Sequence, residues 1–317
     1  MTQKLRIRRA HSAEYDRLAQ LLDAAENSGV TANALRDWDA RLTPDDIHHR
    51  YAATLADAII GYGTIYHAAS AQRRRFLVWL TVDAAHRRRG YGAQFYDVLA
   101  RAARDLGATE FSSECRDDDP AGLAFATQRG FEIRRHFFES ELDLAALDLP
   151  LAWPIVEQVK ALGIRFTSLA GEGQTDEALR KLYELNNQTS LDNPSDDGTY
   201  DRSFQLFKKQ VVEAGWFRAA GQILAVDGER FVGLAAIGIS DDGVSAFNAF
   251  TGVDAGYRGR KIAQALKVLG AQFAIKEGAQ RLKTSNDSEN APMLAVNDRL
   301  GSRRLPGAYA LIKRDIP

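Results

Sequence analysis

Two stretches of the chain combine basic side chains with glycine where a helical pattern begins. The first is HRRRGYGAQF, in which three arginines precede Gly90 and Gly92, and the second is YRGRKIAQAL, which starts at Tyr257. A chain that passes directly from a strand into a helix leaves backbone N–H groups without an intrahelical partner, and these groups bind anions with help from the helix dipole. Glycine lets an anion reach the backbone, and arginine adds charge-assisted hydrogen bonds to phosphate. We therefore predict a pyrophosphate site at each stretch.

The two stretches belong to an internal repeat. A shift of 171 residues places VDAAHRRRGYGA on VDAGYRGRKIAQ without a gap, so that Arg87 falls on Arg258. The same shift pairs Gly107 with Gly278. Self-similarity over so long a period indicates duplicated domains rather than a solenoid. The predicted first domain, linker and second domain are residues 1–145, 146–162 and 163–317.

The same order of elements is predicted in both copies. In the first, the β-rich runs ADAIIGYGTIYHAAS and RRFLVWLTVD precede the glycine stretch. The helix that follows has a buried stripe at Phe95, Leu99, Ala102 and Leu106, and it ends at Gly107. Hairpins followed by a β-α-β unit predict an α+β fold, an α/β sandwich in which each domain has a mixed, mostly antiparallel sheet flanked by helices.

Composition excludes several classes of protein. The chain has 317 residues, a hydrophobic content of 45% and a net charge of −1, which are typical of a globular protein with no global attraction to nucleic acid or membrane. Its single cysteine, Cys115, gives no disulfide framework and no zinc cluster. No signal peptide or membrane-length apolar run is found. We expect a cytoplasmic protein, a monomer or homodimer, without a metal.

Two other phosphate-binding loops do not match. A P-loop needs four residues between its glycines, followed by Lys and Ser or Thr, and this pattern is not seen. A dinucleotide fold would have a third glycine where Phe95 stands.

At these residues the chain resembles the GNAT (Gcn5-related N-acetyltransferase) superfamily, duplicated in tandem. The loop of that family, Arg/Gln-x-x-Gly-x-Gly/Ala, matches Arg87, Gly90 and Gly92 in the first copy. In the second copy Arg258 matches, but Lys261 replaces the middle glycine. A lysine there would leave the backbone cradle intact if its φ stays negative.

The later part of the family pattern is also visible. An Asn before a helix is Asn290 in the second copy, and its equivalent in the first is Asp119. The family's frequent acid, a tyrosine four residues before a glycine, is replaced by Ala126 and Asn297. The chain therefore departs from the family at the residue that would protonate the leaving thiolate.

The resemblance implies acetyl-CoA as cofactor, held by the loop, the following helix and the strand before the loop. For the first copy the implied cofactor-binding residues are Leu80, Thr81, Val82, Arg87, Arg88, Arg89, Gly90, Tyr91, Gly92 and Ala93. For the second copy they are Thr251, Gly252, Val253, Arg258, Gly259, Arg260, Lys261, Ile262, Ala263, Asn286 and Asn290. The strand usually separates from its neighbour there, and its backbone groups bind the pantetheine arm and polarise the thioester.

The implied reaction is acetyl transfer to the primary amine of a small molecule, in which the amine attacks the thioester directly. Candidate catalytic residues are Asn297, Tyr257 and Glu114. The asparagines of the second copy and its longer lead-in, NNQTSLDNPSDDG, favour that copy for the chemistry. Two alternatives stay open: a catalytically silent CoA-binding or sensor protein, and a mycothiol-synthase-like acetyltransferase acting on an amino sugar.

Overall fold

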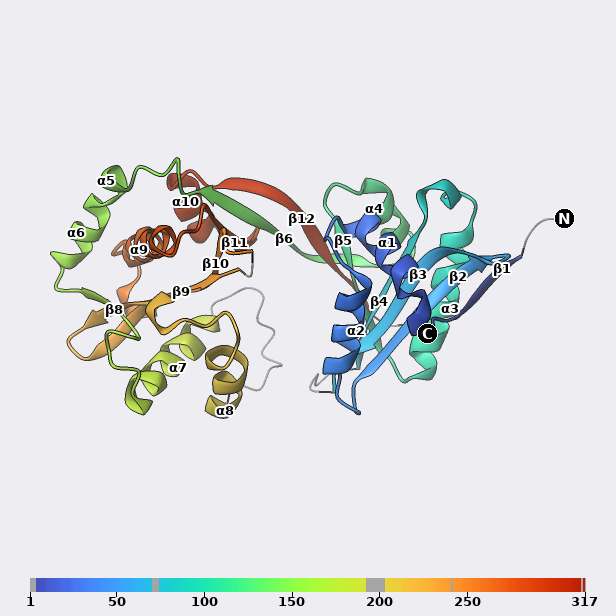
Figure 1. The fold of residues 1–317 in the computed structure, drawn as a ribbon, viewed down its shortest axis with the longest axis horizontal. Coiled ribbons are helices and arrows are strands. Elements are labelled where there is room, and N and C mark those ends of the chain that lie inside the picture. Colours follow the sequence, from blue (N-terminus) through green and yellow to red (C-terminus); the bar gives the residue numbers. More distant parts are fainter. Residues whose placement is uncertain (1–3, 70–73, 192–202, 241, 315, 317) are drawn as a thin grey trace. The chain divides into compact units, whose positions relative to one another are not determined.

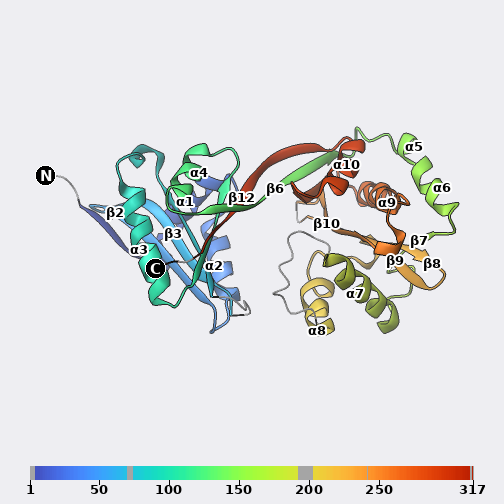
Figure 2. The same cartoon turned by 180° about the vertical axis from the view of Figure 1, so that it is seen from behind.

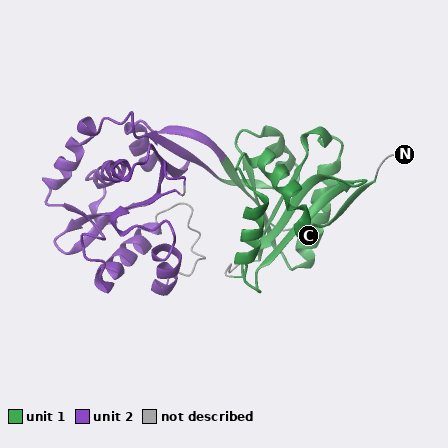
Figure 3. Ribbon diagram, in the orientation of Figure 1, with its two compact units in different colours: residues 1–135, 308–317 green, residues 136–307 purple. Residues whose placement is uncertain are grey.

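The chain forms two compact units (Figure 3). The computed structural model describes residues 4–69, 74–191, 203–240, 242–314 and 316. The first unit contains residues 1–135 and 308–317, and the second contains residues 136–307. Within the described residues, no helix has both the length and the apolar character that crossing a membrane requires.

The sheet of the first unit runs in the order β1-β2-β3-β4-β5-β12. Its neighbouring strands are antiparallel except for β4 and β5, which are parallel. These strands span Leu5–Arg9 (β1), Ile47–Leu55 (β2), Ala58–His67 (β3), Arg75–Val82 (β4), Glu110–Arg116 (β5) and Arg303–Lys313 (β12, of which 308–313 lie in this unit).

Helices cover both faces of this sheet (Figures 1 and 2). On one face α1 (Tyr15–Glu26) and α2 (Ala32–Arg41) bury Leu18 and Leu35 against the sheet. On the other face lie α3 (Tyr91–Asp105) and α4 (Pro120–Thr127). Phe95 and Leu99 of α3 are fully buried, as the predicted apolar stripe requires.

The second unit repeats this arrangement. Its strands run in the order β6-β11-β10-β9-β8-β7, and the parallel pair is β10 with β11. They span Glu132–Asp143 (β6, of which 136–143 lie in this unit), Arg165–Ser168 (β7), Gln222–Asp227 (β8), Arg230–Ile239 (β9), Ser245–Val253 (β10) and Arg281–Asp287 (β11).

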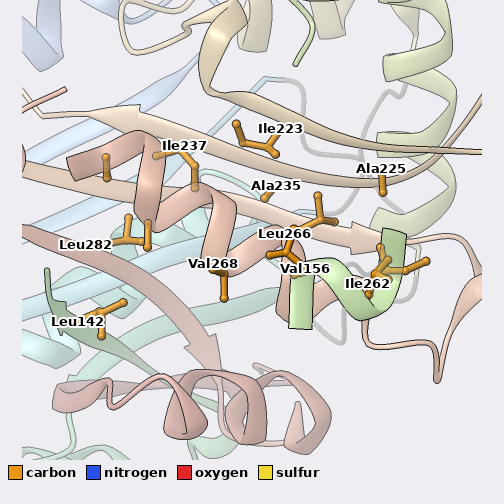
Figure 4. Packing of buried hydrophobic residues seen from close by; sticks show 14 of the residues in the cluster. Leu142, Val156, Ile223, Ala225, Ala235, Ile237, Ile262, Leu266, Val268 and Leu282 are labelled. Carbon is orange, nitrogen blue, oxygen red and sulfur yellow. The ribbon is translucent and has the colours of Figure 1, made fainter. Parts of the chain in front are cut away.

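One face of the second sheet is covered by the helix α9 (Figure 4). Ile262, Leu266 and Val268 of α9 belong to one core cluster with Ile237 of β9 and Val156 of α6. The other face carries α7 and α8. The helices of the unit are α5 (Leu149–Ala152), α6 (Pro154–Lys160), α7 (Asp176–Ser190), α8 (Phe204–Phe207), which continues as a π-helical turn over Lys208–Val212, α9 (Ile262–Lys276) and α10 (Ala291–Arg299).

The units divide the chain differently from the boundaries that the repeat suggests. Strand β6 comes from the first copy but pairs with β11 in the second unit, and β12 comes from the second copy but pairs with β5 in the first. Residues 146–162 lie inside the second unit, where α6 packs on α9 through Val156 and Val159. A strand joins the sheet that offers an unpaired edge, and sequence similarity does not reveal which sheet that is.

Candidate functional site

In each unit the parallel strands are paired only at their beginnings. Pairing of β4 with β5 covers Arg75–Leu77 and Glu110–Ser112. Pairing of β10 with β11 covers Ser245–Asn248 and Arg281–Thr284, and a bulge follows Asn248. Beyond these points the strands leave backbone groups for a ligand, because each has lost its neighbour on that side. A gap of this kind, which we call the splay, lies directly before each glycine stretch.

A cavity of about 340 Å³ occupies the splay of the first unit. Its wall includes Leu80 and Thr81 of β4, Arg87 of the loop, and Tyr96 of α3. The other lining residues are Ala24, Ala25, Glu26, Val78, Trp79, Ser113, Glu114, Cys115, Arg116, Asp118, Asp119, Gly122, Phe125, Ala126, Arg129, Phe131 and Leu311. An elongated ligand with an anionic end at the start of α3 fits this combination of strand, loop and helix N-terminus.

The matched arginines of the two loops have the same local role. Arg87 donates from Nε to the carbonyl of Val82 at 2.8 Å, and Arg258 donates from Nε to the carbonyl of Val253 at 3.3 Å. Each bond joins the loop to the last residue of the preceding strand. The side chain thus fixes the turn, while its fork of N–H groups suits a phosphate oxygen.

Both loops use the left-handed region twice, at equivalent positions. In the first copy Arg88 has φ +62° and Gly90 has φ +81°. In the second copy Gly259 has φ +76° and Lys261 has φ +63°. Each copy thus has one glycine and one strained residue. The condition of a negative φ at Lys261 is not met: the loop has a positive φ there, and lysine adopts it at a cost of about 1 kcal/mol.

Replacing Lys261 with glycine should therefore leave the loop intact and raise the free energy of unfolding by up to about 1 kcal/mol, because relief of the left-handed strain exceeds the extra entropy of the unfolded chain. Urea unfolding measures the change. The same replacement at Lys181, inside helix α7, should lower stability by about 1 kcal/mol. Equal losses at both positions would contradict the assigned strain.

Glu26 and Glu114 are two of the four carboxylates that line the cavity of the first unit. Glu26 ends α1 and Glu114 lies on β5, and Arg116 holds these elements together by donating to the carbonyl of Glu26 at 2.9 Å. Partial burial in the cavity wall raises the pKa of Glu114, although part of its side chain stays exposed to solvent. Burial first, and then the charge of Glu114, raise the pKa of Glu26. The sequence suggested Glu114, but no pattern in it indicates Glu26, which comes from a helix 88 residues earlier.

Tyr96 is a second residue that the sequence did not indicate. It is 8% exposed, lines the cavity and packs edge-on against Phe125, and its Oη accepts a hydrogen bond from Lys313 Nζ at 3.3 Å. A phenol is therefore present in the cavity although Ala126 occupies the family's tyrosine position. The repeat offers a weak signal for it, since the shift of 171 residues pairs Tyr96 with the polar Lys267.

The asparagines of the second unit are engaged in the protein itself. Asn297 is 2% exposed and donates to Asn286 Oδ1 at 2.6 Å. Asn286, 5% exposed, donates to Ser140 Oγ at 2.9 Å and to backbone carbonyls of β6 and β11. Asn290 is the N-cap of α10 and accepts from the Met293 N–H. The structure brings Asn286 and Asn297 together as a buried link between β11, α10 and β6.

Tyr257 lies away from the splay of its unit. Its Oη donates to Asp227 at 2.8 Å, at the end of β8, whereas the splay lies between β10 and β11. The hydrogen bond to Asp227 raises the pKa of Tyr257. The Tyr257 side chain therefore contacts the end of β8 and does not face the splay between β10 and β11.

The remaining implied cofactor residues follow the strand, loop and helix order of each copy. Gly252 lies where Thr189 of α7 approaches β10. In the second loop, Arg260 donates a hydrogen bond to the Gly256 carbonyl. Lys261 Nζ donates a hydrogen bond to the Gln158 side chain at 3.2 Å. The implied residues on strands β4 and β10 are Leu80, Thr81, Val82, Thr251 and Val253. Those in the loops are Arg89 and Gly259. Those in the first turn of helices α3 and α9 are Tyr91, Gly92, Ala93, Ile262 and Ala263.

A smaller pocket lies in the second unit. It measures about 130 Å³ and is mostly apolar, with Trp216 and Phe250 in its wall and Asn186 and Gln222 as its amide groups. The part of the long lead-in from residue 192 to 198 lies outside the described residues. Among the described residues no His, Cys, Asp and Glu group is placed to hold a metal ion.

Comparison with known proteins agrees with this geometry. The acetyltransferase (GNAT) family model matches residues 14–131 and 176–301. Mycothiol acetyltransferase of Corynebacterium efficiens is 25% identical over 255 residues, covering 80% of this chain and 77% of the relative. That of Clavibacter sepedonicus is 28% identical over 226 residues, covering 71% and 68%.

Solved structures show the same fold over the whole chain. A GCN5-related N-acetyltransferase from Sphaerobacter thermophilus aligns with a TM-score of 0.70 at 17% identity, covering 99% of this chain and 96% of that one. A tandem GNAT protein from the clavulanic acid biosynthesis pathway aligns with a TM-score of 0.68 at 16% identity, covering 99% of both. The predicted α+β tandem architecture is confirmed, and the chain belongs to the GNAT family of acetyltransferases, with one family segment in each copy.

Proposed function

We propose that the first unit transfers an acetyl group from acetyl-CoA to the primary amine of a small molecule. The observation that carries this proposal is the pair of carboxylates with raised pKa, Glu26 and Glu114, in the cavity that occupies the splay. The structure thereby favours the first copy, whereas the sequence favoured the second. In the second copy Ser285 stands at the position of Glu114, and the asparagines are used in internal hydrogen bonds.

The chemistry follows from the groups that line the cavity. Carboxylates attract an ammonium ion, and a carboxylate with a raised pKa can accept its proton near neutral pH. The neutral amine attacks the thioester carbonyl carbon, and backbone N–H groups of β4 beyond Leu77 stabilise the oxyanion. When the carbon–sulfur bond breaks, Tyr96 supplies a proton to the thiolate, and the second proton that the nitrogen loses as the amide forms restores the phenol. No covalent enzyme intermediate is needed in this sequence of steps.

The relatives support a small acceptor. They are named mycothiol acetyltransferases, and an amino sugar is an amine of suitable size for the cavity. Asp118 and Asp119, next to Glu114 in the cavity wall, add hydrogen-bond acceptors that suit the hydroxyl groups of a sugar. We therefore propose an amino sugar or a similar polyhydroxylated amine as acceptor.

Thiol release tests the proposal. The full chain is mixed with acetyl-CoA and a panel of primary amines that includes amino sugars, and free CoA is followed with a disulfide reagent. Turnover with at least one amine that disappears in the Glu114→Gln variant is the expected result. Binding of acetyl-CoA without turnover on any amine would favour the silent sensor instead.

A further inference from the structure

The phenol in the cavity of the first unit, Tyr96, receives a hydrogen bond from the end of the chain. Lys313, the last residue of β12, donates from Nζ to Tyr96 Oη at 3.3 Å, and its Nζ lies 5.7 Å from the centroid of the Tyr96 ring. The cavity wall includes Tyr96 but not Lys313. Lys313 therefore contacts the phenol from outside the cavity wall.

This hydrogen bond leaves the proton of the phenol available to the cavity. An ammonium group has donors and no acceptor, so Tyr96 Oη must be the acceptor of the bond from Lys313. In the described part of the chain, no group accepts a hydrogen bond from Tyr96 Oη. The O–H group can therefore donate to a molecule in the cavity, which is what protonation of a leaving thiolate requires.

Lys313 also brings a positive charge to the phenol. Among the residues that the structure describes, no carboxylate forms an ion pair with Lys313. Burial first, and then the charges of Arg104 and Arg129, lower the pKa of Lys313. A cation in such surroundings is costly without a negative partner. The phenolate that Tyr96 becomes when it gives up its proton would be such a partner, because hydrogen bonds between two charged groups are strong.

The second unit has different residues at the two equivalent positions. The shift of 171 residues places Lys267 on the phenol and pairs Lys313 with Leu142. The strand registers agree, because Lys313 lies opposite Phe111 of β5, and Leu142 lies opposite Leu282, the β11 residue that the shift pairs with Phe111. Leu142 is 5% exposed and belongs to the hydrophobic core. The pair of phenol and ammonium thus distinguishes the first unit from the second.

We propose that Lys313 is a positioning residue for the protonation of the leaving thiolate by Tyr96. The inference rests on the proposed acetyl transfer in the first unit. The ammonium group holds the phenol oxygen, so that the O–H group is left to the cavity. When the carbon–sulfur bond breaks, the phenol proton passes to sulfur, and the hydrogen bond from Lys313 stabilises the phenolate until the nitrogen returns a proton to it. Lys313 keeps its own protons and does not touch the substrate.

The last strand of the second copy would in this way serve the chemistry of the first unit. Residues 308–313 of β12 pair with β5 in that unit, and Leu311 of the same strand lines the cavity. The exchange of strands between the copies therefore makes the acid of the first unit depend on the last residues of the chain.

Steady-state thiol release by the full chain, with acetyl-CoA and an amine that it turns over, tests this role. Lys313→Met removes the ammonium and keeps an unbranched side chain of similar length. It should lower kcat about 10- to 100-fold, the effect of losing one charge-assisted hydrogen bond, and leave KM for acetyl-CoA unchanged. Lys313→Arg keeps a charged donor and should recover most of kcat.

Arg314→Met is the matched control. Arg314 follows Lys313 directly, but its side chain is 54% exposed and points to Glu132, with 3.9 Å between Nη1 and the carboxylate. The control removes one positive charge from the same end of the chain without touching the phenol. Its kcat should equal that of the unmodified protein.

A double-mutant cycle separates a role through Tyr96 from a general structural role. Tyr96→Phe should lower kcat by about 10²-fold, as expected for loss of a general acid, and Lys313→Met should have no further effect in that variant. Effects that multiply in the double variant, a higher KM with unchanged kcat, or a normal kcat of Lys313→Met would overturn the proposal. Thermal unfolding checks that the variants are folded, and Lys313→Gln replaces Lys313→Met in the cycle if the apolar side chain unfolds the protein.

The outcomes also separate this inference from the proposed function. Turnover that is lost in Glu114→Gln but normal in Lys313→Met overturns the role of Lys313 alone. A normal kcat of Tyr96→Phe overturns the roles of both Tyr96 and Lys313, while acetyl transfer in the first unit stands. Absence of turnover on any amine overturns the proposed function together with this inference.

Discussion

Glu114→Gln should lower kcat/KM for the amine by about 10²- to 10⁴-fold, which is the range for loss of a general base. The glutamine keeps the shape of the side chain but cannot take a proton from the ammonium. Steady-state thiol release at saturating acetyl-CoA measures the change. Glu132→Gln is the matched control, because this glutamate is exposed and outside the cavity, and its rate should equal that of the unmodified protein.

Glu114 should also make the activity and the stability of the protein depend on pH, and its raised pKa fixes the direction of both changes. The ordinary pKa of a glutamate is about 4.3. Since burial raises the pKa of Glu114, the midpoint of the acidic limb of kcat/KM should lie above that pH. The folded state retains the proton at a pH where the unfolded state has lost it. This contribution to stability is present below the unfolded pKa and is lost as pH rises through the folded pKa.

Glu114→Gln should therefore stabilise the protein at neutral pH while it removes activity, because the variant has no desolvated charge at this position. The gain should vanish at a pH below both pKa values. Thermal unfolding across pH measures it. Normal turnover of the variant would show that Glu114 is not the general base, and a lower stability at neutral pH would show that its charge carries no cost of desolvation.

Arg87→Glu should weaken acetyl-CoA binding by the first unit about 10- to 100-fold, which corresponds to loss of a charge-assisted hydrogen bond. The new carboxylate also repels a pyrophosphate at the start of α3, where the helix dipole favours an anion. Isothermal titration calorimetry measures the affinity. Because Arg87 also bonds the Val82 carbonyl, Arg87→Lys should recover part of the binding and not all of it.

Arg101→Glu provides the control for net charge, since it makes the same change on an exposed position of α3 away from the cavity. Its affinity should stay within twofold of the unmodified protein, within the scatter expected of surface changes of up to about 0.5 kcal/mol. Equal effects of the two charge reversals would mean that the loop arginine acts only through the overall field.

The repeated loop shows how far local sequence can determine a site. A strand that passes into a helix through glycine and arginine presents unpaired N–H groups wherever it occurs, so residues such as Arg87, Gly90 and Arg258 led to the α+β fold and the tandem architecture. The two pyrophosphate sites stay predictions. The family comparison confirms the fold and the duplication. The sequence also indicated that Lys261 departs from the pattern, but the sign of its φ depends on the loop geometry.

Tertiary structure decided which copy carries the candidate chemistry. Glu26 and Glu114 are far apart in the chain, and they line one cavity because Arg116 of β5 bonds the carbonyl at the end of α1. Their pKa values are raised because the fold takes part of each side chain out of water, and Glu114 also raises the pKa of Glu26. Asn286 and Asn297, which favoured the second copy, are buried and bonded to each other. Residue type and spacing predict the two loops whose backbone N–H groups could bind a pyrophosphate. Burial and long-range contacts determine the pKa values of Glu26 and Glu114, and therefore which chemistry these side chains can perform.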